Sequence, residues 1–169
     1  MYHVLIAEHH QLVAEAIVHM LEGEPAIRTC HRAGSTEELC RAAREQRPDV
    51  VLINLHLPPA GGLDAMRRML VSMPRLHVIC MGLNYHGPYP ALVLEHGAGG
   101  LLSLDCSREE LLEAIHTVAG GGVHVGAKLA QTVLRSGLGC SQTPASRLFL
   151  DPSPPTCAPR EAHPSTASR

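Results

Sequence analysis

Short apolar runs alternate with amphipathic stretches along the first 125 residues. Five strands are predicted from these runs, over residues 3–7, 27–33, 50–53, 77–81 and 100–103. The run over 50–53 contains no polar residue, as is typical of a strand covered on both faces by helices, and we take it as the central strand. Arg28 and Arg32 interrupt the run over 27–33, which places that strand nearer an edge.

Between these runs, apolar residues recur at helical spacing and predict five helices. The residues expected to face inward from the longer helices are Leu12, Ala16, Met20 and Leu21; Leu39, Ala42 and Ala43; Leu63, Met66 and Leu70; and Leu111, Leu112, Ile115 and Val118. A shorter helix over 91–96 should end at Gly97. Ser35 with Glu38, and Ser107 with Glu110, have the spacing of capping boxes that begin helices.

The alternation predicts an α/β fold, a three-layer sandwich of the flavodoxin-like type with a doubly wound five-stranded parallel sheet in the order 2-1-3-4-5. In such sheets, chemistry lies just beyond the carboxyl ends of the strands. Asn54 follows the central strand and therefore stands where a reactive side chain is expected. An amide carries no charge and is a poor nucleophile, so this position should not form an acyl phosphate.

The chain changes character after residue 125. Residues 127–134 predict one more helix, with Leu129, Val133 and Leu134 as its apolar stripe. We therefore divide the chain into a domain over 1–125, a linker helix over 126–136 and a disordered tail rich in Pro and Ser over 137–169. This division leaves no room for a second folded domain.

Composition excludes several classes of protein. The net charge of −2 argues against a protein that coats nucleic acid, and we expect no direct nucleic-acid binding by this chain. No apolar run is long enough to span a bilayer and no signal peptide begins the chain, so we expect a cytoplasmic protein without a membrane partner. The six Cys include no close pair, which argues against a disulfide framework or a thiolate zinc site.

Five collinear segments carry a resemblance to a known family. They are Val4–Val13, Arg47–Leu55, Gly62–Leu63, His96–Leu102 and Glu109–Ile115. Together they resemble the receiver domain of response regulators of the NarL/FixJ (LuxR-type) family, which has the CheY-like fold. The resemblance implies a two-component system: a sensor kinase transfers a phosphoryl group to an Asp with the help of Mg²⁺, and the receiver controls an attached helix-turn-helix domain in transcription regulation.

Residue by residue, the resemblance also implies that the phosphorylation machinery is missing. Glu8 and His9 match the family's acidic pair, and Asn54 matches the phosphoacceptor. Gly82 matches the switch residue that carries a hydroxyl group, and Leu104 matches the lysine. Leu101 matches the switch aromatic. One Glu beside a His and an amide is a weak cage for Mg²⁺. We expect a pseudo-receiver with no enzymatic activity, no cofactor and Mg²⁺ binding that is weak or absent.

Three functions remain open from the sequence. The favoured one is a phosphorylation-independent module that acts by protein contact, as a homodimer or as a heterodimer with a related response regulator; a sensor kinase is a further candidate partner. The second is a truncated conventional phosphorelay regulator that binds DNA through another part. The third is a metal- or small-ligand-sensing domain, with Glu8, His9 and His56 as weak metal candidates near His10. We favour solvated side chains there and expect no metal.

Overall fold

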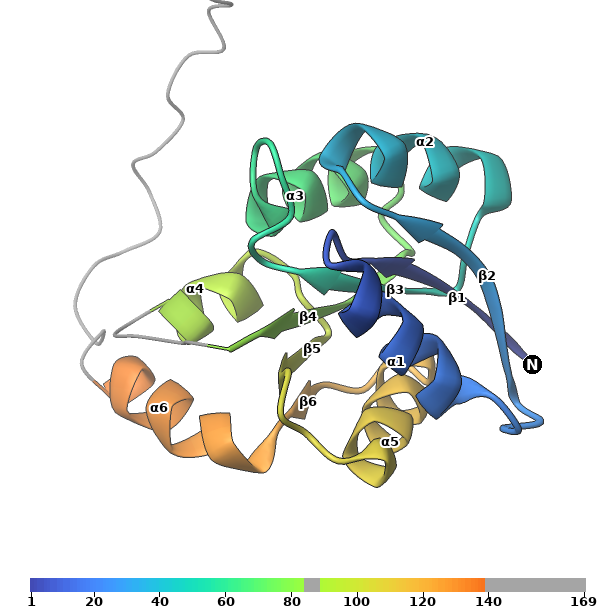
Figure 1. The fold of residues 1–169 in the computed structure, drawn as a ribbon. Coiled ribbons are helices and arrows are strands. Elements are labelled where there is room, and N and C mark those ends of the chain that lie inside the picture. The colour runs from blue at the N-terminus through green and yellow to red at the C-terminus, as the bar shows by residue number, and fades with distance from the viewer. Residues whose placement is uncertain (84–88, 139–169) are drawn as a thin grey trace, which may run out of the picture.

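A computed structural model of the 169-residue chain describes residues 1–83 and 89–138 (Figure 1). The strands are β1 (Tyr2–Ala7), β2 (Ile27–Ala33), β3 (Val50–Asn54), β4 (His77–Gly82), β5 (Gly100–Ser103) and β6 (His124–Val125). The helices are α1 (Gln11–Leu21), α2 (Thr36–Gln46), α3 (Gly62–Ser72), α4 (Tyr89–Glu95), α5 (Arg108–Ala119) and α6 (Ala127–Leu138). Among these helices, none is long and apolar enough to cross a membrane.

One parallel sheet forms the middle layer, in the order β2-β1-β3-β4-β5-β6. The predicted α/β sandwich and the order of its first five strands are confirmed, with β2 at an edge. The sixth strand was not predicted, because two residues are too few to show a periodic pattern. His124 N–H donates to Gly99 O at 3.0 Å and Gly126 N–H donates to Leu101 O at 2.8 Å, which joins β6 to β5.

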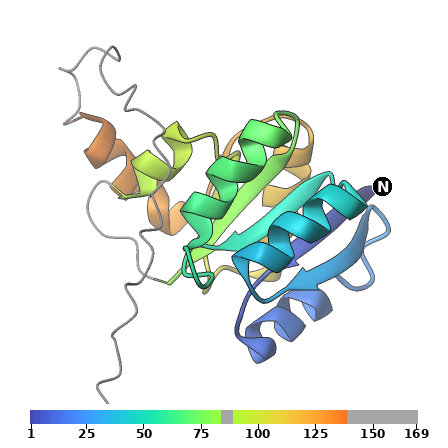
Figure 2. The same cartoon turned by 90° about the horizontal axis from the view of Figure 1, so that it is seen from above.

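Two apolar clusters fill the spaces on either side of the sheet. On one side α1 and α5 cover β1, β3, β4 and β5, with Ile17 and Ile115 fully or nearly buried. On the other side α2 and α3 lie next to each other over the sheet (Figure 2). That second cluster also includes Val93 of α4 and Leu129 of α6, and these two helices pack side by side at the β5 end (Figures 1 and 2).

The face that α1 buries differs from the predicted one. The structure buries Ala14, Ile17 and Leu21, whereas Leu12 is 81% exposed and Ala16 is exposed. Most residues of this helix are apolar, so two different faces of the helix show apolar residues at helical spacing. Packing against β1 and α5 selects the stripe that the pattern alone left undecided.

Smaller differences concern the other helices. Ala114 rather than Leu112 completes the buried face of α5, and Ala65 and Met69 are buried in α3 where Leu63 and Leu70 are half-buried. In α6, Leu129 is buried but Leu134 is 64% exposed. The helix α4 begins at Tyr89, two residues before the predicted start. The division of the chain at residue 125 stays a prediction, and the predicted tail lies outside the described residues except for the last two residues of α6.

The two predicted capping boxes form only in part. Ser35 Oγ accepts a hydrogen bond from Glu38 N–H at 3.2 Å, but the Glu38 carboxylate accepts from Gly34 N–H at 2.9 Å rather than from Ser35. Ser107 Oγ likewise accepts from Glu110 N–H at 3.2 Å. The Glu110 carboxylate instead accepts from Ala127 N–H at 2.9 Å, so it links the first turn of α5 to the first turn of α6.

Candidate functional site

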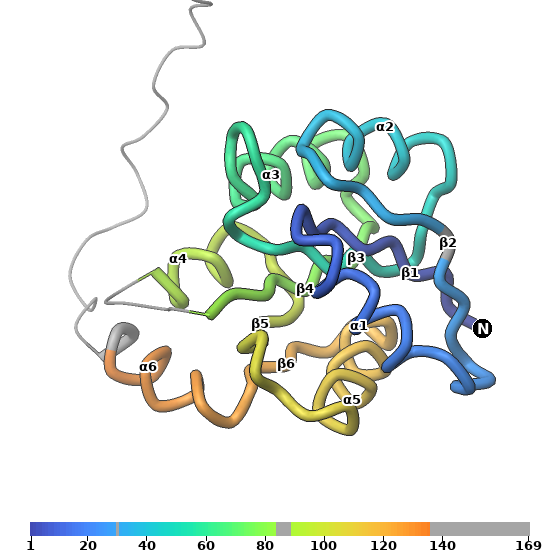
Figure 3. Tube along the Cα trace, in the orientation of Figure 1, coloured from blue at the N-terminus to red at the C-terminus, as the bar shows by residue number. Residues whose placement is uncertain are grey.

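The site lies where β1 and β3 end side by side (Figure 3). Ala7 pairs with Ile53 in the sheet, so Glu8 and Asn54 follow their strands at the same level. Both residues are 2% exposed. Asn54 Nδ2 donates a hydrogen bond to Glu8 Oε2 at 2.6 Å, and Asn54 Oδ1 accepts one from His56 N–H at 2.8 Å. The amide of Asn54 therefore has a partner at each end, and these partners fix its orientation.

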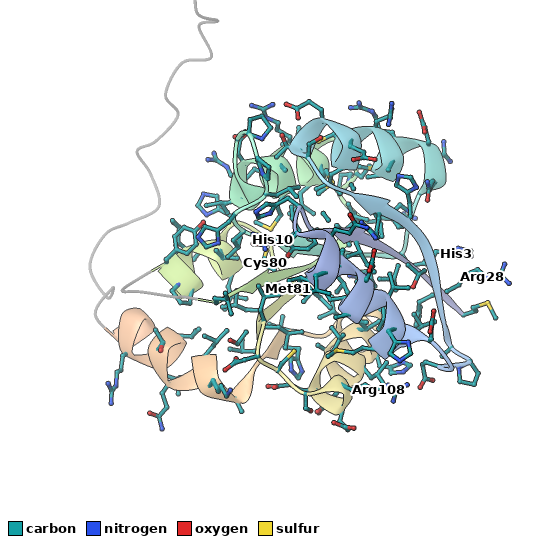
Figure 4. All side chains as sticks on the ribbon, in the orientation of Figure 1. His3, His10, Arg28, Cys80, Met81 and Arg108 are labelled. Carbon is teal, nitrogen blue, oxygen red and sulfur yellow. The ribbon has the colours of Figure 1, made fainter. Side chains whose placement is uncertain are left out.

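The second oxygen of Glu8 faces two imidazoles. Glu8 Oε1 accepts a hydrogen bond from His10 N–H at 2.8 Å and lies 2.9 Å from His10 Nδ1 and 3.3 Å from His9 Nδ1. His10 is the N-cap of α1 (Figure 4), and its extended backbone leaves its N–H free for the Glu8 carboxylate. The His9 and His10 rings are tilted by 45° to each other, with their centroids 3.7 Å apart. The turn from β1 into α1 thus gathers one buried carboxylate and two histidines.

The electrostatics of this turn favour an ionised Glu8. Burial by itself raises the pKa of the Glu8 carboxyl. Hydrogen bonds from His10 N–H, the Asn54 amide and the His10 ring, together with the charge of His9, outweigh burial and hold that pKa below its ordinary value. Glu8 is therefore a carboxylate at neutral pH, and its neighbours satisfy both of its oxygens.

The positions predicted to match the switch residues carry no polar side chain. Gly82 ends β4, and its carbonyl accepts a hydrogen bond from Leu104 N–H at 3.0 Å. The Leu104 side chain is half-buried against the apolar cluster under α1 and α5, and Leu101 is fully buried in β5. The only lysine of the chain, Lys128, lies on α6 and forms an ion pair with Asp105.

The expected set of metal candidates was Glu8, His9 and His56, but the structure places His10, and not His56, beside Glu8 and His9. The possible metal-ligating atoms of Glu8, His9 and His10 all lie within 4.8 Å of one another. His56 is exposed and contributes only its backbone N–H, to Asn54. The sequence did not reveal this grouping, because consecutive side chains usually diverge. A signal was nevertheless present, since Glu8-His9-His10 directly joins a buried strand to a helix.

Two cavities in the described part of the chain lie away from this turn. One, of about 300 Å³, lies between α2 and α3 and is lined by Cys40, Arg44 and Arg68 among others. The other, of about 870 Å³, opens at the amino-terminal edge of the sheet beside Tyr2 and His77. Neither of these two cavities is lined by Glu8, His9 or Asn54.

Comparison with curated proteins gives relatives among full response regulators. The chain is 34% identical over 131 residues to the response regulator GacA of Pseudomonas syringae pv. syringae (strain B728a), covering 78% of this chain and 61% of that protein. It is 31% identical over 136 residues to the response regulator UvrY of Escherichia coli (strain K12), covering 80% of this chain and 62% of that protein. The chain thus spans about three fifths of the length of these relatives.

Solved structures share the fold. A LuxR-family two-component response regulator from Aurantimonas sp. SI85-9A1 superposes with a TM-score of 0.76 at 24% identity, covering 82% of this chain and 99% of that one. The isolated receiver domain of RcsB from Salmonella enterica serovar Typhimurium, with the phosphomimetic BeF₃⁻, superposes with a TM-score of 0.73 at 17% identity, covering 78% and 98%.

The family comparison agrees with both sets of relatives. Residues 4–116, which run from β1 into α5, match the response regulator receiver domain. This region contains Glu8, His9, Asn54, Gly82 and Leu104, so every position compared above lies inside the match. The chain therefore belongs to the response regulator receiver domain family, whose members serve two-component signalling.

Proposed function

We propose that this receiver is a pseudo-receiver, a signalling module that works through protein contacts without being phosphorylated. The observation that carries the proposal is the buried hydrogen bond of 2.6 Å between Asn54 Nδ2 and Glu8 Oε2. A phosphoacceptor needs a carboxylate oxygen that can attack phosphorus and form an acyl phosphate, which is a mixed anhydride. Asn54 offers an amide instead, and its oxygen already accepts a hydrogen bond from His56 N–H.

The residues at the site do not fit Mg²⁺. This ion prefers octahedral coordination by oxygen, usually with one or two carboxylates and several waters. Of Glu8, His9 and Asn54, only Glu8 is a carboxylate, with one oxygen hydrogen-bonded to Asn54 and the other to His10. His9 presents nitrogen where the family has a second acidic residue. We therefore expect Mg²⁺ to bind weakly or not at all.

The lysine that would stabilise a phosphoryl group is missing from its family position. Transferred phosphoryl groups need positive charge to balance their negative oxygens. Leu104 places an apolar side chain at the position of the family's lysine, and Lys128 is paired with Asp105. A phosphoryl group at Asn54 would thus add negative charge beside the Glu8 carboxylate with no lysine to balance it.

Protein contact is the route that we favour for the signal. The packed helices α4 and α6 carry exposed apolar side chains, with Leu92 38% exposed and Leu134 64% exposed. Exposed apolar side chains on neighbouring helices are a common element of protein interfaces. We infer a cytoplasmic module that pairs with a copy of itself or with a related response regulator, with a sensor kinase as a second candidate partner. Sedimentation of wild type and of a Leu92→Ser/Leu134→Ser variant tests self-association, with Val71→Ser on α3 as the control.

The central test is phosphorylation of the full chain. We expect incubation with acetyl phosphate and Mg²⁺ to leave the intact mass unchanged. The positive control is a variant that rebuilds the family pattern, His9→Asp/Asn54→Asp/Gly82→Ser/Leu104→Lys. A phosphoryl adduct on wild type that disappears in Asn54→Ala would overturn the proposal and favour a conventional phosphorelay receiver. An adduct on Asn54→Asp alone would show that His9, Gly82 and Leu104 matter less than we infer.

A further inference from the structure

We propose that Glu8, His9 and His10 form a binding site for a divalent transition-metal ion of the Zn²⁺, Ni²⁺ and Cu²⁺ class. The ligand atoms are Glu8 Oε1, His9 Nδ1 and His10 Nδ1, which all lie within 4.8 Å of one another. The site would give the domain a second input, independent of whether Asn54 can be phosphorylated. It therefore goes beyond the proposed function and does not rest on it.

The distances from Glu8 Oε1 to the two imidazole nitrogens are close to those between neighbouring ligands of a metal ion. Zn²⁺ lies about 2.0–2.2 Å from nitrogen and oxygen ligands in tetrahedral sites, which puts neighbouring ligand atoms about 3.3–3.6 Å apart. Glu8 Oε1 and His9 Nδ1 are 3.3 Å apart, and Glu8 Oε1 and His10 Nδ1 are 2.9 Å apart. A small rotation of the His10 ring that lengthens the distance between Glu8 Oε1 and His10 Nδ1 by about 0.5 Å would bring this pair to the separation of two zinc ligands.

The three groups combine a fixed carboxylate with two accessible imidazoles. The Glu8 side chain is fully buried, whereas the side chains of His9 and His10 are 28% and 61% exposed. A metal ion can therefore approach from solvent on the histidine side. Binding requires each imidazole to present the lone pair of Nδ1 to the metal ion and to carry its one ring proton on Nε2, so any proton on Nδ1 must move to Nε2 or to solvent.

Asn54 acts here as a positioning residue. Its Nδ2 donates to Glu8 Oε2, and this bond turns the other oxygen, Oε1, toward the two imidazoles. Hydrogen bonds of this kind orient the ligands of metal sites and tune their affinity. The side chain at the phosphoacceptor position would thus hold the carboxylate ready for a metal ion.

The donor set selects the class of ion. Two imidazole nitrogens and one carboxylate oxygen suit borderline metals such as Zn²⁺, Ni²⁺ and Cu²⁺, whereas Mg²⁺ prefers oxygen alone. Three ligands from the protein leave at least one coordination position for water or for a side chain of a bound partner. A site of this kind can make a protein contact depend on the metal.

The test is a calorimetric titration of the full chain, free of any affinity tag, with Zn²⁺ and separately with Mg²⁺. We expect one Zn²⁺ per chain and no saturable binding of Mg²⁺. His9→Gln and His10→Gln should each weaken Zn²⁺ binding roughly tenfold or more, and Asn54→Ala should weaken it roughly tenfold through the loss of orientation. His19→Gln and His56→Gln are matched controls, because His19 also pairs with a glutamate, at 2.9 Å from Glu22, and His56 adjoins the site.

Substitution with Co²⁺ adds a readout that a merely structural role of these residues would not change. We expect the visible absorption of a site with nitrogen and oxygen ligands, lost in His9→Gln and in His10→Gln. Equal Zn²⁺ affinity in wild type and both variants, an absorption band of thiolate ligation, or no saturable Zn²⁺ binding would each overturn the proposal. Because both histidines are partly exposed, the variants should fold, and their melting temperatures verify this.

Discussion

Asn54 Nδ2 and Glu8 Oε2 lie 2.6 Å apart, and the hydrogen bond between them joins the carboxyl ends of β3 and β1. Both side chains are buried, so neither can exchange this partner for water at low cost. The bond leaves Asn54 neutral and satisfied and leaves Glu8 ionised and directed at two histidines. We infer that the position where the family carries out phosphoryl transfer is built here as a stable polar contact.

The first prediction concerns Asn54→Asp. Two carboxyl groups at this distance cannot both ionise at low cost, so the pKa of the pair should rise above its usual range. Because the folded pKa is raised, the destabilisation should be small at low pH, where the pair keeps a proton, and should grow as the pH rises through that pKa. We expect a loss of about 1–3 kcal/mol of unfolding free energy near neutral pH, measured by urea denaturation at several pH values.

The control for Asn54→Asp is Gln11→Glu. Gln11 Nε2 donates to Glu15 Oε1 at 2.8 Å, so this change also replaces an amide that faces a carboxylate, but at an exposed position. Solvent screens exposed charges, and we expect the unfolding free energy to change by less than about 0.5 kcal/mol. Equal, pH-independent effects of the two substitutions would show that the burial of Asn54 and Glu8 does not matter.

The second prediction concerns the acid sensitivity of the fold. The pKa of Glu8 is held below its ordinary value, so its contribution to stability is present above the pKa of the unfolded chain and is lost as the pH falls through the folded pKa. Glu8→Gln should therefore be less stable than wild type at neutral pH by about 1–2 kcal/mol. The difference should shrink below about pH 4.3, where glutamate becomes protonated in the unfolded chain.

Thermal unfolding of both proteins across this pH range measures that difference. Glu45→Gln, which removes an exposed carboxylate from α2, is the control for loss of one charge. A gap between wild type and Glu8→Gln that stays constant with pH would mean that Glu8 stabilises the fold by packing rather than by its charge.

The third prediction concerns Gly62, the first residue of α3. A Cβ added here would lie 2.3 Å from Asn54 O and 2.8 Å from Leu55 Cα, which are backbone atoms that cannot rotate away. Gly62→Ala should therefore push α3 from the end of β3 and lower the unfolding free energy by about 2 kcal/mol or more. Gly34→Ala is the control, because its Cβ would meet only Glu38 Oε2 at 3.8 Å. Equal melting temperatures of the two variants would contradict the close approach.

The fourth prediction concerns the link between α5 and α6. Glu110 Oε1 accepts a hydrogen bond from Ala127 N–H, and Glu110→Ala removes it. We expect a loss of about 0.5–1.5 kcal/mol and faster hydrogen exchange at Ala127. Glu109→Ala removes a carboxylate from the same helical turn without touching α6 and is the matched control. Unchanged exchange at Ala127 in Glu110→Ala would show that the link does not hold the start of α6.

Local patterns in the sequence were sufficient for most of the fold. The unbroken apolar run over 50–53, the N-cap serines Ser35 and Ser107 and the stop at Gly97 each report a constraint between near neighbours in the chain. The alternation of strands and helices then leaves few topologies, because parallel strands need right-handed crossovers. The same reasoning placed Asn54 at the end of the central strand, as the structure shows.

Contacts between distant residues were settled only by the tertiary structure. The chain alone determined that Asn54 is neutral, that Leu104 is apolar and that Glu8 is followed by two histidines. Packing decided that α1 buries Ile17 instead of Leu12, that β6 joins the sheet and that Glu110 binds Ala127. The local turn from β1 into α1 brings His10 to Glu8, whereas the His56 side chain stays apart. Periodicity shows that a face is apolar, but the choice of partner depends on how surfaces far apart in sequence fit together in space.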